Sequence, residues 1–140
     1  MKLLPLLVLL AACSLSVGGL NMGTGSHPHV NFAVKGTLGP VEALHAPTTQ
    51  RGVNDLYMLG AYPSIGKDIK VSFGAGWAWW RECGACNQNG YECNHMWYDG
   101  ASAGLGLVYE FGHARLDLRY QRFWEAPFDE ALLFTIGVTP

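Results

Sequence analysis

The chain has 140 residues, a net charge of −2 and a pI near 6.2, and 14% of its residues are charged. Because an ordinary soluble domain has roughly 25% charged residues, this chain is unusually poor in charge. The balance of charge, without a basic stripe, excludes a typical nucleic-acid binder. No apolar run reaches the roughly 18 residues of a membrane-spanning helix, which excludes a helical membrane protein. The 18 Gly, 6 Phe, 6 Tyr and 5 Trp indicate one small β-rich domain instead.

The first 12 residues have the features of an export signal. A single Lys precedes the apolar stretch LLPLLVLLAA, as in a secretory signal peptide. Leu-Ala-Ala-Cys at its end matches the bacterial lipobox, which predicts cleavage before Cys13 and lipidation of its thiol. The alternative is an ordinary cleavage after Ser16. The absence of Asp after Cys13 indicates an outer-membrane address, so we expect a signal peptide at 1–12 and a lipid-anchored domain at 13–140.

Most of the remaining sequence alternates between apolar and small or polar residues. In 69–80, for example, all odd positions are apolar, whereas most even positions are Gly, Ala, Ser or Lys. This period of two is typical of β-strands whose two faces meet different surroundings. It predicts strands at 30–38, 69–80, 101–111, 114–121 and 131–139. Weaker alternation predicts further strands at 15–22, 41–46 and 55–62.

The connections between these strands alternate in length. Short turns are expected at Gly39-Pro40, 63–68 and Gly112-His113, and longer loops at 23–29, 47–54, 81–95 and 125–130. Short turns on one edge and long loops on the other are typical of outer-membrane barrels. The sequence therefore predicts an all-β fold, an eight-stranded antiparallel up-and-down transmembrane barrel. Both termini lie on the turn side, which places Cys13 at the inner leaflet of the outer membrane.

The charged positions indicate which face of each strand points inward. Arg115, Asp117 and Arg119 share one face, and Lys70 and Glu110 lie on faces otherwise made of small residues. Such faces suit a crowded polar lumen, and aromatic residues near the strand ends suit interfacial girdles. An eight-stranded barrel is just wide enough for its own side chains, so we expect a salt-bridge network that seals the lumen. The alternative for the aromatic residues is the core of a soluble barrel.

Three cysteines lie close together in the segment 81–95. Cys83, Cys86 and Cys93 precede His95, and four such ligands could in principle bind zinc. Their spacing matches no common zinc ribbon, and exported proteins form disulfides readily. We therefore predict a disulfide between Cys93 and either Cys83 or Cys86, with one thiol left over, and no metal; free thiols are the remaining alternative.

One cluster combines an acid, an imidazole and a hydroxyl. Glu42 could orient His45, which could activate a hydroxyl such as that of Thr48. In a strand at 41–46, however, His45 shares a face with Val41 and Ala43, opposite to Glu42. We therefore expect His45 to face lipid and Glu42 to face the lumen, and we expect no catalysis.

The barrel pattern of the mature chain resembles the small OmpA-like and OmpX-like outer-membrane barrels. More distantly, His45-Ala46-Pro47-Thr48 approximates the His-x-Ser of the lipid A deacylase barrels, although those carry it in a late strand. The resemblance implies an outer-membrane barrel surrounded by outer-membrane lipid. A lipid-anchored soluble barrel resembling the bacterial lipocalins is the alternative fold.

The sequence thus favours a non-enzymatic outer-membrane lipoprotein, with a surface or structural role and a possible partner at loop 81–95. No cofactor, metal or nucleic acid is expected. The first alternative is a hydrolase or transferase that acts on lipid A or phospholipid through His45. The others are a lipocalin-like binding protein and a receptor-blocking lipoprotein of the kind that phages encode.

Overall fold

A computed structural model describes residues 13–22, 30–47, 53–86, 93–126 and 129–140. The regular secondary structure in these ranges consists of β-strands alone. No helix in these ranges is long and apolar enough to cross a bilayer. The strands are β1 (Cys13–Met22), β2 (Val30–Leu38), β3 (Val41–Pro47), β4 (Val53–Ala61), β5 (Ser64–Gly66), β6 (Ile69–Cys86), β7 (Cys93–Phe111), β8 (Ala114–Phe123) and β9 (Glu130–Val138).

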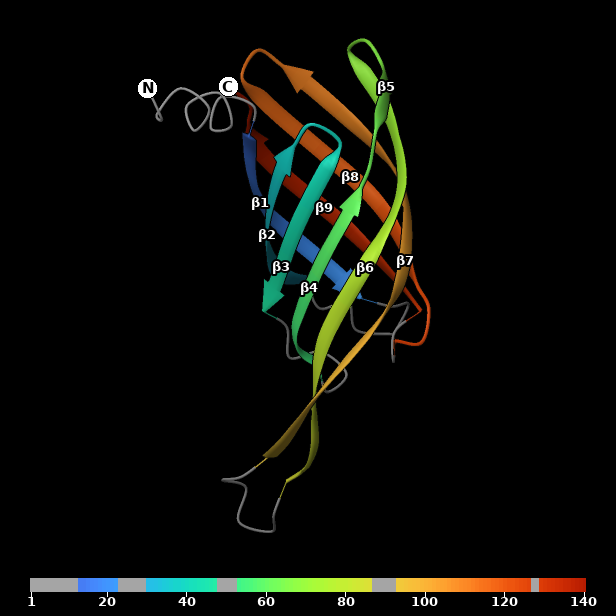
Figure 1. Ribbon diagram of the computed structural model, residues 1–140. Helices are drawn as coiled ribbons and strands as arrows, with labels where there is room; N and C mark the ends of the chain where they lie inside the picture. Colours follow the sequence, from blue (N-terminus) through green and yellow to red (C-terminus); the bar gives the residue numbers. More distant parts are fainter. Residues whose placement is uncertain (1–12, 23–29, 48–52, 87–92, 127–128) are drawn as a thin grey trace, which may run out of the picture.

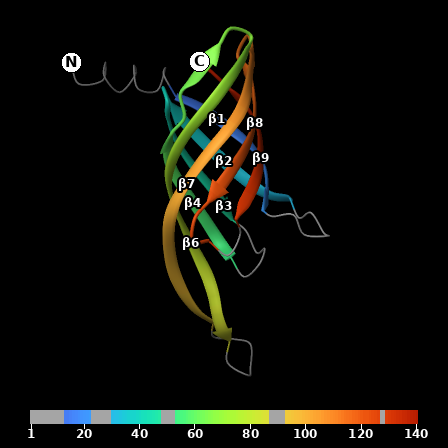
Figure 2. The same ribbon diagram turned by 90° about the vertical axis from the view of Figure 1, so that its right-hand side faces the viewer.

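The strands form one closed antiparallel sheet (Figures 1 and 2). Consecutive strands pair with each other, except β4 and β5, and β1 closes the barrel against β9. The short strand β5 follows β4 after a break at Tyr62 and Pro63, and both pair with different stretches of β6. Because β4 and β5 share one position, the described strands occupy eight positions around the circumference, which confirms the predicted all-β, eight-stranded antiparallel barrel.

The two ends of the barrel differ in their connections. At one end, tight turns at Gly39-Pro40 and Gly112-His113 join consecutive strands, and both glycines have φ near +58°, a left-handed conformation that favours Gly. Cys13 pairs with Leu38 at the same end, and Val138 pairs with Ala114. β1 therefore begins on the turn side and β9 ends there, at the top of Figure 1.

At the other end, two strands extend far beyond the rest. β6 has 18 residues and β7 has 19, whereas the other strands have at most 10. Their ladder continues to Cys86 opposite Cys93, and the resulting hairpin projects from the barrel at the bottom of Figure 1. We call residues 83–86 and 93–98 the β6–β7 arm.

The arm corrects the prediction of a loop at 81–95, because residues 81–86 and 93–95 are strand. The Gly, Cys and Asn content of this segment hides the alternation on which the prediction relied. The antiparallel pairing of β6 with β7 continues there from the barrel wall, as far as Cys86 opposite Cys93. The predicted turn at 63–68 likewise contains the three residues of β5.

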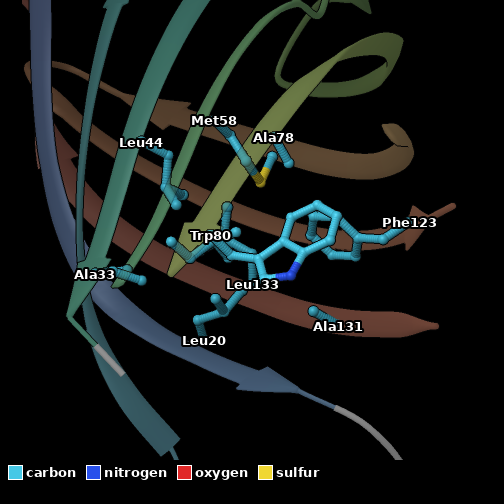
Figure 3. Packing of buried hydrophobic residues seen from close by; sticks show 11 residues of the cluster. Leu20, Ala33, Leu44, Met58, Ala78, Trp80, Phe123, Ala131 and Leu133 are labelled. Atoms are coloured by element: carbon cyan, nitrogen blue, oxygen red, sulfur yellow. The ribbon is translucent and has the colours of Figure 1, made fainter. Parts of the chain in front are cut away.

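The loop-side half of the lumen is filled by apolar side chains. Trp80 is 1% exposed, and Figure 3 shows its ring in the middle of the cluster, between residues from opposite walls. This apolar plug was not predicted, since we expected polar side chains throughout the lumen. The members of the cluster are Leu20, Ala33, Leu44, Ala46, Leu56, Met58, Ala78, Trp80, Phe123, Ala131 and Leu133.

Candidate functional site

The turn-side half of the lumen contains a buried network of four charges. Arg119 donates two hydrogen bonds to Glu42, from Nη1 to Oε1 at 2.5 Å and from Nη2 to Oε2 at 2.8 Å. Lys35 pairs with Asp117, which also accepts a bond from Arg119 Nη2 at 3.2 Å. All four side chains are at most 5% exposed. Two cations thus neutralise two carboxylates, as buried charges require.

A second group of charges continues this network toward the turn side. Lys70 Nζ lies 2.5 Å from Glu110 Oε2, and Arg115 lies 3.5 Å from Glu110 and 3.8 Å from Asp117. Lys70 and Glu110 are about a quarter exposed, so the network reaches toward water at this end. The predicted placement of these residues on one inward face is therefore confirmed.

Glycines on β7 make room for the largest cation. Gly104 lies opposite Gln121 in the ladder, and a Cβ there would come within 2.3 Å of Gln121 Oε1 and 2.8 Å of Arg119 Cδ. Arg119 Cζ lies 4.0 Å from the centre of the Tyr62 ring, whose hydroxyl accepts a bond from Gln121 Nε2 at 2.8 Å. The predicted role of the small-residue faces, to accommodate long side chains from neighbouring strands, is confirmed here.

The two halves together leave the lumen packed. Trp80 and Arg119 belong to the largest fully buried side chains, and they lie in the apolar plug and the charge network respectively. An eight-stranded barrel is only wide enough for such filling. The side chains that fill the lumen therefore form two layers, the predicted salt-bridge network and an apolar plug that was not predicted.

The candidate catalytic residues lie on opposite sides of the barrel wall. Glu42 is 5% exposed and bound to Arg119 in the lumen, whereas His45 is 40% exposed on the outer wall. This agrees with the parity of the strand, so the two cannot act together. Thr48 lies outside the described residues. His45 has a different carboxylate partner, because its Nε2 lies 3.3 Å from Asp55 Oδ1.

Asp55 is the centre of a polar and aromatic group on the outer wall at the loop side. Its Oδ2 lies 2.5 Å from Arg81 Nη2, and Arg81 Cζ lies 5.9 Å from the centre of the Trp97 ring. The His45 ring stacks on Tyr57, with 4.4 Å between centroids. We call these five residues, His45, Asp55, Tyr57, Arg81 and Trp97, the rim cluster.

The register of four strands assembles the rim cluster, with Trp97 of β7 opposite Arg81 of β6. β4 lies between β3 and β6, so that His45 is opposite Tyr57 and Asp55 is opposite Arg81. A register shift in β4 immediately before Asp55 marks the point where the regular ladder ends. Sequence reasoning did not single out Asp55 or Arg81. The sequence did contain an indication: Asp55 and Arg81 are at odd-numbered positions, which in these strands otherwise carry the outward apolar residues.

The cysteines are only partly described. Cys13 is exposed on the outward face of β1 and has a free thiol. The backbone ladder places Cys86 opposite Cys93 and Cys83 opposite His95, but these side chains lie outside the described part. The disulfide therefore stays a prediction. Within the described ranges, no group of three His, Cys, Asp or Glu side chains is arranged to hold a metal ion.

No family model and no curated protein matches this sequence. Among solved structures, the chain is similar to the N-terminal β-barrel domain of OprF from Pseudomonas aeruginosa, with a TM-score of 0.58 and 16% sequence identity. The match covers 89% of this chain and 96% of that domain. The similarity thus extends over nearly the whole barrel, and this chain shares the fold of the OprF domain.

Proposed function

We propose that this protein is an outer-membrane β-barrel whose sealed lumen conducts no solute and whose wall holds the β6–β7 arm outside the membrane. The first support is the outer wall, where large apolar side chains are about half exposed on every side. A water-soluble barrel exposes no apolar surface of this extent, which argues against the lipocalin-like alternative. Representative residues are Phe32, Leu59, Phe73, Leu105, Leu118 and Phe134.

The distribution of charge supports the same conclusion. The charged residues in the middle of the barrel point into the lumen, as in the buried network of Lys35, Glu42, Asp117 and Arg119. Small membrane barrels have this arrangement, with lipid outside and a packed polar interior. In such barrels the short turns face the periplasm, so the arm end faces outward.

The observation that carries the proposed role is the arm itself. Met96 and Tyr98 have the same inward parity as Trp80, yet they are 55% and 39% exposed. Trp97, between them on the other face, is 56% exposed, so both faces of β7 are accessible at residues 96–98, where the strand leaves the barrel. A barrel with a packed lumen and one long projecting hairpin is suited to present that hairpin, which supports the proposed non-enzymatic surface role.

The orientation of the arm can be tested by labelling intact cells. In a background with serine at Cys83, Cys86 and Cys93, we expect Met96→Cys to react with a membrane-impermeant maleimide. Lys67→Cys, in the exposed turn before β6 at the opposite end, should react only after the outer membrane is permeabilised. Both variants should show the heat-dependent gel shift of a folded barrel.

Two results would contradict this proposal. Labelling of Lys67→Cys but not Met96→Cys in intact cells would reverse the orientation. Release of the protein without detergent would mean that the barrel does not span the membrane. The background variant, which keeps only Cys13, measures labelling of the anchor position alone.

We also propose that Cys13 carries a lipid at the inner leaflet. Cys13 is exposed on the outward face of β1 at the turn end, where an attached acyl chain enters the bilayer directly. Cys13→Ser should abolish incorporation of labelled fatty acid and leave a precursor that keeps its first 12 residues. The matched control is Ser14→Ala, which should be labelled and cleaved like the wild type. Normal processing of Cys13→Ser would instead indicate cleavage after Ser16.

A further inference from the structure

The rim cluster is a group of polar side chains on a wall that otherwise faces lipid. Arg81 is 34% exposed and Asp55 18% exposed. A charge on the lipid face of a barrel is costly at the bilayer midplane but costs little near the interface. Given the proposed orientation, the cluster therefore lies at the level of the headgroups of the outer leaflet.

The cluster has the chemistry of a phosphate site. A guanidinium has five N–H donors in a planar fork, and the contact with Asp55 uses Nη2. Asp55 is shared by two basic side chains, Arg81 and His45, so one carboxylate orients two groups that can face an anion. The rings of Tyr57 and Trp97, with centroids 5.9 Å apart, provide an aromatic floor beside them.

An apolar furrow leads from this cluster along the outer wall. A groove of about 370 Å³ begins at His45 and Tyr57 and continues past Val34 and Leu59 to Gly36 and Ala43. A second groove of about 470 Å³ contains the same Gly36 and Ala43 and continues to the turn end. Among the described residues, no atom would lie within 4 Å of a Cβ at Gly36, so none of them fills the furrow there.

We propose that the rim cluster and the furrow bind one molecule of lipid A, with a headgroup phosphate at Arg81 and an acyl chain along Gly36 and Ala43. This inference rests on the proposed outer-membrane location. Lipid A is the phosphorylated lipid of the outer leaflet, and its negative charge complements the guanidinium of Arg81. A polar site at headgroup level that continues into an apolar furrow matches the two ends of one lipid molecule.

Native mass spectrometry of the full-length protein in neutral detergent tests this site. Bisphosphorylated lipid A, phosphatidylglycerol and phosphatidylcholine are titrated separately. We expect one lipid A molecule to stay bound to the wild type, at a tenfold or greater preference over phosphatidylcholine. Arg81→Gln should lower the affinity for lipid A about tenfold, because it removes the charged fork. Gly36→Leu should weaken retention of lipid A independently, by filling the furrow.

Arg122→Gln is the matched control. Arg122 is exposed on β8 at the same end of the outer wall, outside the rim cluster, so its loss removes the same charge elsewhere. The gel shift on heating verifies that each variant is folded, and Gly36→Leu tests the furrow if Arg81→Gln fails to fold.

The outcomes separate this site from the proposed function. Equal retention of lipid A by wild type, Arg81→Gln and Gly36→Leu would overturn the site, and so would equal binding of phosphatidylcholine. A preference for phosphatidylglycerol over lipid A would reject lipid A as the occupant. Displacement of the lipid by millimolar inorganic phosphate would mean a free-anion site. If the wild type does not insert into vesicles, the proposed function itself is wrong, whereas insertion without lipid preference contradicts only the site.

Discussion

Arg119→Met should lower the free energy of unfolding of the barrel by about 3–5 kcal/mol, the cost of breaking a buried ion pair from one side. Arg119 makes both hydrogen bonds to Glu42 and a third to Asp117, and all three residues are at most 5% exposed. Without Arg119, the only other cation that pairs with both carboxylates in this four-charge network is Lys35. Lys35 alone then faces both buried carboxylates, and Arg115 reaches only Asp117, at 3.8 Å, so the buried negative charge loses most of its compensation.

Denaturant unfolding in detergent micelles measures this loss. The outward-facing Arg122→Met is the control and should change stability by about 1 kcal/mol or less, as exposed charges do. The double variant Arg119→Met with Glu42→Gln should recover part of the loss, because it removes the stranded charge together with its partner. A loss below about 1 kcal/mol for Arg119→Met would show that the network contributes little to stability.

The strands of the barrel wall were predictable because the wall separates two different surroundings. In 69–80 and 101–111, the outward residues are apolar and mostly large whereas most inward residues are small, and the period of two follows directly. The same contrast placed Arg115, Asp117 and Arg119 in the lumen. Turn chemistry at Gly39 and Gly112 then located the short connections.

The interactions across the lumen could not be predicted in the same way. Lys35 and Asp117 are 82 positions apart, and Arg119 and Glu42 are 77 apart, so their pairing depends on closure of the barrel and on its register. His45 and Asp55 depend on the alignment of β3 with β4 for the same reason. The alternation of apolar and polar residues predicts which face of the sheet a side chain is on. It does not predict the position of that side chain along the barrel axis. The separation of the lumen into a charged half and an apolar half was therefore missed.

Trp80→Ala should also destabilise the barrel by about 3–5 kcal/mol, through a different mechanism. Trp80 is 1% exposed at the centre of the apolar plug. Its Nε1 donates a hydrogen bond to Glu82 Oε1 at 2.8 Å, and its ring stacks on that of Tyr98 with 6.4 Å between centroids. Removing the indole loses its buried apolar area and leaves a cavity between walls that the closed sheet holds apart. Trp79→Ala, on the adjacent outward position, should cost less because lipid or detergent refills the space.

Ion efflux from vesicles distinguishes the roles of the two layers in the lumen. Trp80→Ala should remain impermeable to small ions, because the bidentate contact of Arg119 with Glu42 still closes the turn-side half. Efflux should rise only when Trp80→Ala is combined with Arg119→Met, since water and ions then reach both halves. Ion efflux through Trp80→Ala alone would show that the apolar plug blocks ions in the wild type and that the charge network leaves a path for them. Conversely, a sealed double variant would show that the backbone and the remaining small side chains fill the lumen without either layer.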